Sequence, residues 1–126
     1  MNNLLSINSL TLAYIGDSVY EVYIRNYLVN SGIIKVNNLQ KEAIKYVSAK
    51  GQCKIVTSML NNNFLTEEEF EVFKRARNYK TTSHPKNTDI ITYKYATGFE
   101  AVIGYLYLKK DIKRLDELFE YCIRGD

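Results

Sequence analysis

The chain has 126 residues, of which 46% are hydrophobic and 25% charged, and this composition is typical of one soluble globular domain spanning residues 1–126. Its net charge of +3 is too small to indicate a nucleic-acid partner by itself. The cysteines, Cys53 and Cys122, match no metal-ligand spacing, so we interpret them as reduced packing thiols. No secretory signal opens the sequence and no apolar run is long enough to cross a membrane, so we expect a cytoplasmic protein.

The first half of the sequence predicts two helices. Apolar residues at helical spacing predict a helix over residues 9–29 that is apolar on nearly all sides and therefore buried. Gly32 is the expected stop of this helix. Asn37 and Gln40 have the spacing of a capping box, which predicts a second helix over residues 38–60, before a polar break of three asparagines.

The second half predicts three more helices. Thr66 and Glu69 form the clearest capping box, and the helix that they open should run to about residue 77. Residues 78–88 hold the only proline and predict an exposed loop. A fourth helix is expected over residues 89–109, and Asp111 is placed to cap a fifth. With strong helical and weak strand signals, the sequence predicts an all-α single domain.

Two acidic residues lie in segments that the pattern predicts to be buried helices. Asp17 is part of the most apolar helix and has no basic residue three or four positions away, and Glu100 is the only charged residue between Lys94 and Lys109. A buried, unpaired carboxylate must shift its pKa, find a distant partner or bind a metal ion. A structural role for each acid and a shared site for a hard cation are equally compatible with the pattern.

Basic residues gather in one stretch of the sequence that contains no acid. The stretch from Lys74 to Lys86 carries five lysines and arginines, directly after a cluster of glutamates. The charges alone do not decide between a solvated helix with ends of opposite sign and a surface that contacts phosphates.

Several segments, in order along nearly the whole chain, resemble the ribonuclease III catalytic domain and in particular its short Mini-ribonuclease III subgroup. They are LAYIGDSVYEVYIRNYL, VSAKGQ, TEEEFEVFKRARNYK and PKNTDIITYKYATGFEA, the last continuing into VIGYLYL. The resemblance implies a helical ribonuclease III-like domain that acts as a homodimer and cuts both strands of an RNA duplex. It implies that Asp17 and Glu100 are the catalytic Mg²⁺ ligands, and that 23S ribosomal RNA precursor is the substrate. A ribosomal protein or pre-ribosomal particle is left open as a further partner.

Some acids of the family pattern are replaced in this sequence. Ordinary members have acids four and seven residues before the first motif's aspartate, where this chain has Ala13 and Leu10. A further aspartate three residues before the later glutamate is Thr97 here, and Glu42 is only a loose candidate for a fourth acid. The number of bound metal ions is therefore left open.

The hypothesis from the sequence is phosphodiester hydrolysis by a water that Mg²⁺ activates. The alternative is a non-catalytic helical RNA-binding or ribosome-associated module of the same fold, and Mg²⁺-dependent cleavage of long duplex RNA separates the two. Since duplex RNA is recognised mainly through its shape, phosphates and 2′-hydroxyls, the RNA-facing candidates are basic or amide side chains. They are Lys50, Lys74, Arg75, Arg77, Asn78, Lys80, Lys86 and Asn87.

Overall fold

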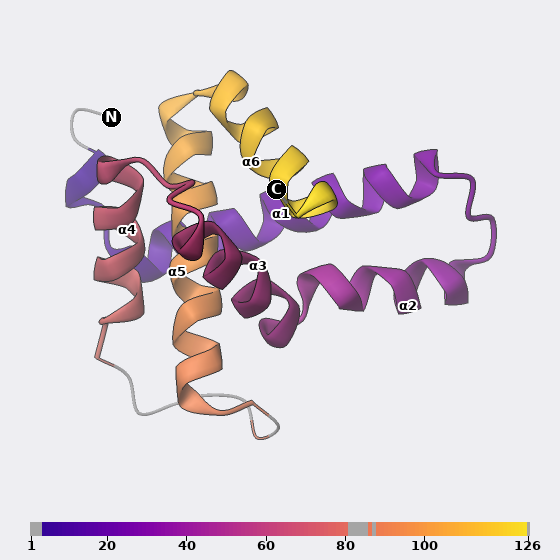
Figure 1. Cartoon of the computed structure of the whole chain (residues 1–126), viewed down its shortest axis with the longest axis horizontal. Helices are drawn as coiled ribbons and strands as arrows, with labels where there is room; N and C mark the ends of the chain where they lie inside the picture. The colour runs from indigo at the N-terminus through magenta and orange to yellow at the C-terminus, as the bar shows by residue number, and fades with distance from the viewer. Residues whose placement is uncertain (1–3, 81–85, 87, 126) are drawn as a thin grey trace.

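The computed structural model describes residues 4–80, 86 and 88–125, and within them it contains helices and no strand. A short 3-10 helix, η1, precedes six α-helices (Figure 1). Their bounds are Leu4–Ser6 for η1, then α1 Ser9–Asn30, α2 Val36–Val47, α3 Ala49–Asn61, α4 Glu67–Arg77, α5 Ile90–Lys109 and α6 Ile112–Arg124. The predicted all-α fold is confirmed. None of the described helices combines the length and the apolar character that crossing a membrane requires.

Helix α5 is the centre of the packing. Every residue from Ala96 to Leu106 is buried except Glu100, which is only partly buried. In Figure 1, α5 stands upright, α1 crosses it, and α4 runs beside it. Such an element, apolar on all sides, is stable only when other helices enclose it. Glu100 is therefore the one carboxylate in the most enclosed stretch of the fold, which holds no lysine, arginine or histidine.

Two glycines let α1 and α5 cross with their backbones almost in contact. A Cβ atom on Gly16 would collide with the carbonyl oxygen of Glu100, and one on Gly104 would collide with the carbonyl oxygen of Leu12. Only glycine allows this approach without displacing either backbone. The crossing therefore fixes the position of Asp17, the residue after Gly16, against the middle of α5.

The structure corrects the predicted second helix. Residues 38–60 do not form one helix, because the chain leaves helical geometry at Ser48, with ψ of 157°, and divides into α2 and α3. The Ser48 hydroxyl accepts a hydrogen bond from the backbone N–H of Gly51 at 3.0 Å and so caps α3. The capping box assigned to Asn37 and Gln40 is also wrong: both lie inside α2, whose N-cap residue makes no side-chain capping bond.

The other predicted helix ends agree with the structure. The capping box of Thr66 and Glu69 is present in full, and Asp111 accepts a hydrogen bond from the third residue of α6. Asp89, the first residue of the predicted range, caps α5, so the helix itself begins one residue later at Ile90. Gly32, with φ of +92°, follows the end of α1 in a conformation that favours glycine.

Helix α1 is not buried on all sides, contrary to the prediction from its composition. Tyr14 is 79% exposed, Val22 68% and Val29 56%. At 100° per residue these three side chains lie within one narrow stripe, opposite the face that packs on the core. The apolar character of this helix therefore exceeds what the fold of one chain covers.

Candidate active site at the crossing of α1 and α5

Glu100 is the carboxylate in the less favourable environment. Burial raises its pKa, the negative charge of the neighbouring Asp17 raises it further, and together they bring it to about 8. An amide hydrogen bond from Gln52 Nε2 to Glu100 Oε2, 3.3 Å long, acts in the opposite direction. The structure thus brings together the two predicted acids, Asp17 of α1 and Glu100 of α5, which are 83 residues apart in the sequence.

Asp17 itself is exposed, and this corrects the expectation of a carboxylate buried in an apolar helix. At 100° per residue it lies at the margin of the face of α1 that packs on the core, on the side towards Tyr14, so it is open to solvent and still next to Glu100. The energetic anomaly inferred from the sequence therefore belongs to Glu100. Asp17 is accessible to solvent and to a ligand, while Glu100 lies inward from it.

Glu21 is a third acid near Glu100, and its charge also raises the pKa of that group. Its carboxylate is bound by Arg25, one helical turn later, at 3.1 Å. This is the surface ion pair that the spacing predicts. Glu21 is therefore compensated by its own helix, whereas no ion pair to Asp17 or Glu100 is found among the described residues.

Gln52 is a site residue that the sequence pattern did not bring to attention. Its side chain is only 2% exposed, and its amide nitrogen donates both to the Val47 carbonyl oxygen, at 3.0 Å, and to Glu100. The signal that would have found it is its register, since Gln52, Val56 and Met59 form the buried face of α3. A glutamine at such a position indicates a polar partner inside the fold.

The acids of the ordinary family pattern have no substitutes at the corresponding positions. Ala13 is buried, and Leu10 is partly exposed and apolar. Thr97 donates its hydroxyl to the Tyr93 carbonyl oxygen within α5. Glu42, on α2, forms an ion pair with Lys45 at 3.1 Å.

The donor set at the crossing fits a divalent cation held partly by the protein. Two adjacent carboxylate oxygens are the ligands that Mg²⁺ prefers, and a cation between Asp17 and Glu100 would remove their mutual repulsion. Within the described part of the chain, no three histidine, cysteine, aspartate or glutamate side chains are placed to hold a metal ion together. The remaining positions around a cation would thus belong to water or to substrate phosphate, which Mg²⁺ accepts readily.

The basic candidates on α4 are partly engaged with neighbouring side chains. Lys74 forms an ion pair with Glu71 at 2.8 Å and lies over the Phe70 ring, 4.8 Å from its centre. Arg77 lies over the Phe73 ring and is only partly exposed. Both side chains are partly exposed, so their positive charges remain at the surface.

The remaining RNA candidates lie at several places on the surface. Arg75 is exposed and donates to the carbonyl oxygen of Ile7 at 3.4 Å. Further exposed candidates are Lys50 in the first turn of α3, Asn78 at the end of α4, Lys80 and Lys86. Asn87, and most of the loop predicted over residues 78–88, lie outside the described residues.

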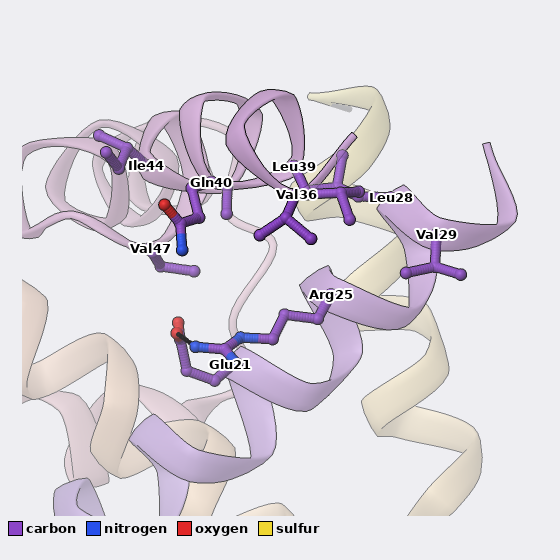
Figure 2. A pocket seen from close by; sticks show the side chains of 10 residues that line it. Glu21, Arg25, Leu28, Val29, Val36, Leu39, Gln40, Ile44 and Val47 are labelled. Atoms are coloured by element: carbon purple, nitrogen blue, oxygen red, sulfur yellow. Dashed lines mark hydrogen bonds and ion pairs between the residues drawn. The ribbon is translucent and has the colours of Figure 1, made fainter. Parts of the chain in front are cut away.

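An apolar hollow of about 420 Å³ lies between α1 and α2, apart from the two carboxylates. Figure 2 shows Leu28 and Val36 on its walls and the ion pair of Glu21 and Arg25 at its edge. Neither Asp17 nor Glu100 lines it. This hollow offers apolar contact but no pair of free oxygen donors for metal-assisted chemistry.

Comparison with known proteins agrees with this arrangement of helices. The family model described as the Ribonuclease III domain matches residues 10–111, which include both carboxylates. The chain belongs to the ribonuclease III family. Mini-ribonuclease 3 of Enterococcus faecalis is 48% identical over 124 residues, which cover 98% of this chain and 94% of the relative. Mini-ribonuclease 3 of Streptococcus pneumoniae is 47% identical over 118 residues, or 94% and 92% of the two chains.

A crystal structure of a protein from Fusobacterium nucleatum has the same fold as this ribonuclease III family member. It is 34% identical, has a TM-score of 0.83, and the match covers 95% of this chain and 94% of the other. The resemblance to the Mini-ribonuclease III subgroup and the single helical architecture are thereby confirmed. The chain is an endoribonuclease of the ribonuclease III type.

Proposed function

We propose that this endoribonuclease hydrolyses double-stranded RNA with Mg²⁺ held by Asp17 and Glu100. The observation that carries the proposal is the pair of adjacent carboxylates, one exposed and one withdrawn from solvent, without an ion-pair partner among the described residues. An arrangement that raises the pKa of one acid to about 8 is costly for a purely structural site. It is useful where a divalent cation binds and offsets the repulsion.

The two acids have different tasks in this proposal. Asp17 lies at the solvent side, where it can accept a hydrogen bond from the attacking water and orient it towards the phosphorus atom. Glu100 must give up its proton to act as a ligand, since carboxylates bind metal ions in their ionised form. The cation, when bound, supplies a lower pKa for the attacking water and positive charge for the phosphate.

The test of this proposal is the substitution Asp17→Asn, which keeps the size of the side chain and removes its charge. Because Asp17 is exposed, the variant should fold like the wild type. We expect its cleavage of long duplex RNA in Mg²⁺ to fall by at least about a hundredfold. Full cleavage by folded Asp17→Asn, or no Mg²⁺-dependent cleavage by the wild type, would contradict the proposal.

We further propose that the exposed basic residues of α4 and its C-terminal continuation bind the RNA backbone. The support is their lack of neighbouring acids in the sequence from Lys74 to Lys80 and their exposure, which is clearest for Arg75 and Lys80. Removing one side chain that binds a phosphate should reduce the slope of log affinity against log salt concentration by about one. A salt titration of the Arg75→Ala, Lys80→Ala variant should therefore give a shallower slope, and a slope equal to that of the wild type would exclude this surface.

A homodimer is also part of the proposal. Its support is the exposed apolar stripe of α1 formed by Tyr14, Val22 and Val29. Exposed apolar groups of this size are covered in many proteins by a second chain. Sedimentation should show a dimer for the wild type and a monomer for Tyr14→Arg, and a monomeric wild type would contradict this part.

For the cellular substrate we propose 23S ribosomal RNA precursor, on the strength of the resemblance to the Mini-ribonuclease III subgroup. Mapping the ends produced from a precursor transcript, with and without ribosomal proteins, tests this substrate and the further partner together. We expect cuts at a few defined positions with 5′-phosphate ends. Absence of any cut under conditions that cleave long duplex RNA would reject the precursor as substrate.

A further inference from the structure

We propose that Gln52 is a positioning residue that holds the Glu100 carboxylate in place for the cation. This inference rests on the function proposed above and adds a residue to the same site. Three features at the start of α3 support this role for the Gln52 amide.

The first feature is the break between α2 and α3 at Ser48. The serine hydroxyl accepts from Gly51 N–H, and its carbonyl oxygen accepts from Gln52 N–H at 2.9 Å, so the first turn of α3 is fixed from both sides. A Cβ atom on Gly51 would collide with the Lys45 carbonyl oxygen. The glycine therefore allows α3 to begin directly against the last turn of α2, and this sets the position of the next residue, Gln52.

The second feature is the orientation of the Gln52 amide. Its nitrogen lies 3.0 Å from the Val47 carbonyl oxygen, which can only accept a hydrogen bond, so the NH₂ group must face this side. The same nitrogen donates its second hydrogen to Glu100 Oε2 at 3.3 Å. The carbonyl at the end of α2 thus directs an amide donor, and not an acceptor, towards the carboxylate.

The third feature is an oxygen without a partner. Gln52 Oε1 is buried and accepts no hydrogen bond, the one such side-chain atom found among the described residues. A buried acceptor left unpaired is unfavourable, and an apolar side chain of similar size would fill the same space without that cost. Packing therefore does not explain a glutamine at this position, whereas the two hydrogen bonds of its amide nitrogen, to Val47 and to Glu100, do.

As a consequence, the hydrogen bond from Gln52 restrains one oxygen of the Glu100 carboxylate. The amide hydrogen bond favours the ionised form of Glu100 against burial and the charge of Asp17. It also limits rotation of the carboxylate. Gln52 acts through Glu100 and is assigned no contact of its own with the cation or the substrate.

The test uses Gln52→Met, which keeps the length and volume of the side chain but removes both the donor and the unpaired oxygen. MgCl₂ is titrated into the RNA-free protein while amide NMR shifts around positions 17 and 100 are followed, and the Mg²⁺ dependence of duplex RNA cleavage is measured in parallel. We expect Mg²⁺ affinity to fall by about ten- to a hundredfold. The melting temperature should stay close to that of the wild type, because losing the bond to the Val47 carbonyl oxygen is offset by removing the unpaired Oε1.

Gln40→Met is the matched control, because Gln40 is the chain's other glutamine and lies exposed on α2. It should leave Mg²⁺ affinity unchanged. Wild-type Mg²⁺ affinity in folded Gln52→Met would overturn the positioning role, even if Asp17→Asn abolishes cleavage as the proposed function requires. If Gln52→Met and Gln52→Leu both fail to fold, the amide serves the start of α3 rather than Glu100, and the inference is likewise overturned.

Discussion

Glu69 and Glu100 are both withdrawn from solvent, yet they have opposite surroundings. Glu69, 3% exposed, accepts two hydrogen bonds of 2.8 Å from Arg114 and one of 3.0 Å from the Thr66 backbone N–H. Glu100 accepts one amide hydrogen bond and faces Asp17. The first carboxylate has its charge and its hydrogen bonds satisfied within the fold. The second is left with a charge that an external cation would satisfy, and this difference distinguishes a structural acid from a candidate catalytic one.

The largest change in stability is expected when Glu69, the carboxylate whose charge is paired within the fold, is replaced. Glu69→Gln can still occupy the capping box, but it removes the buried counter-charge of the Arg114 guanidinium and leaves only the exposed Glu117, 3.1 Å away. Breaking a buried pair from one side costs about 3–5 kcal/mol. Chemical denaturation should show this loss. The comparison would fail if Glu69→Gln were as stable as the wild type.

A smaller effect is expected from the pH dependence of the metal-free protein. The unfolded chain loses the Glu100 proton near pH 4.5, whereas the folded protein keeps it to about pH 8. The folded state therefore binds more protons between these values, and its free energy of unfolding falls as pH rises through this window. At about 1.4 kcal/mol per pKa unit, discounted for partial exposure, the loss is of the order of 2–4 kcal/mol. Denaturation in a chelator at several pH values measures it.

Glu100→Gln provides the control for this pH effect, since the amide does not titrate. Its stability should change less between pH 4.5 and 8 than that of the wild type. Equal pH profiles for the two proteins would show that the unfavourable environment of Glu100 was wrongly assigned.

The close approach of α1 and α5, which brings Asp17 next to Glu100, can be disrupted at Gly16. In Gly16→Ala the new methyl group must push α1 away from the Glu100 backbone, at a cost of about 2 kcal/mol. The displacement also moves Asp17 from Glu100, so cleavage should fall more than the change in stability explains. Gly32→Ala is the matched control: it strains a positive φ in open space, costs about 1 kcal/mol and should leave cleavage per folded molecule unchanged. Thermal melts and initial rates compare the two variants, and equal effects would argue against a special role of the crossing.

Local chemistry was the part of the fold that the sequence could predict. The capping box of Thr66 and the cap at Asp111 involve residues three apart, so their spacing alone identified them. The break at Ser48 was missed because a serine capping its own chain competes with the helix only when the following turn packs well. That packing depends on contacts with other elements, which spacing does not show.

The candidate site was predictable in part for the same reason. Asp17 and Glu100 were identified as isolated acids in apolar helices, but their relative exposure depends on which face of α1 the core covers. The role of Gln52 depends on a carbonyl group five residues earlier and a carboxylate 48 residues later. Glu69 was recognised as a capping residue, while its bond to Arg114 is a long-range contact that no local pattern indicates.

The central claim is that Glu100, whose charge is not paired within the fold, takes part in the chemistry, whereas Glu69, which is paired with Arg114, does not. The most direct measurement is the initial rate of duplex RNA cleavage in Mg²⁺ for Glu100→Gln and Glu69→Gln, each scaled to its folded fraction. We predict a loss of at least about a hundredfold for Glu100→Gln and a rate close to wild type for Glu69→Gln. Wild-type cleavage by folded Glu100→Gln, or an equal loss in both variants, would contradict the account.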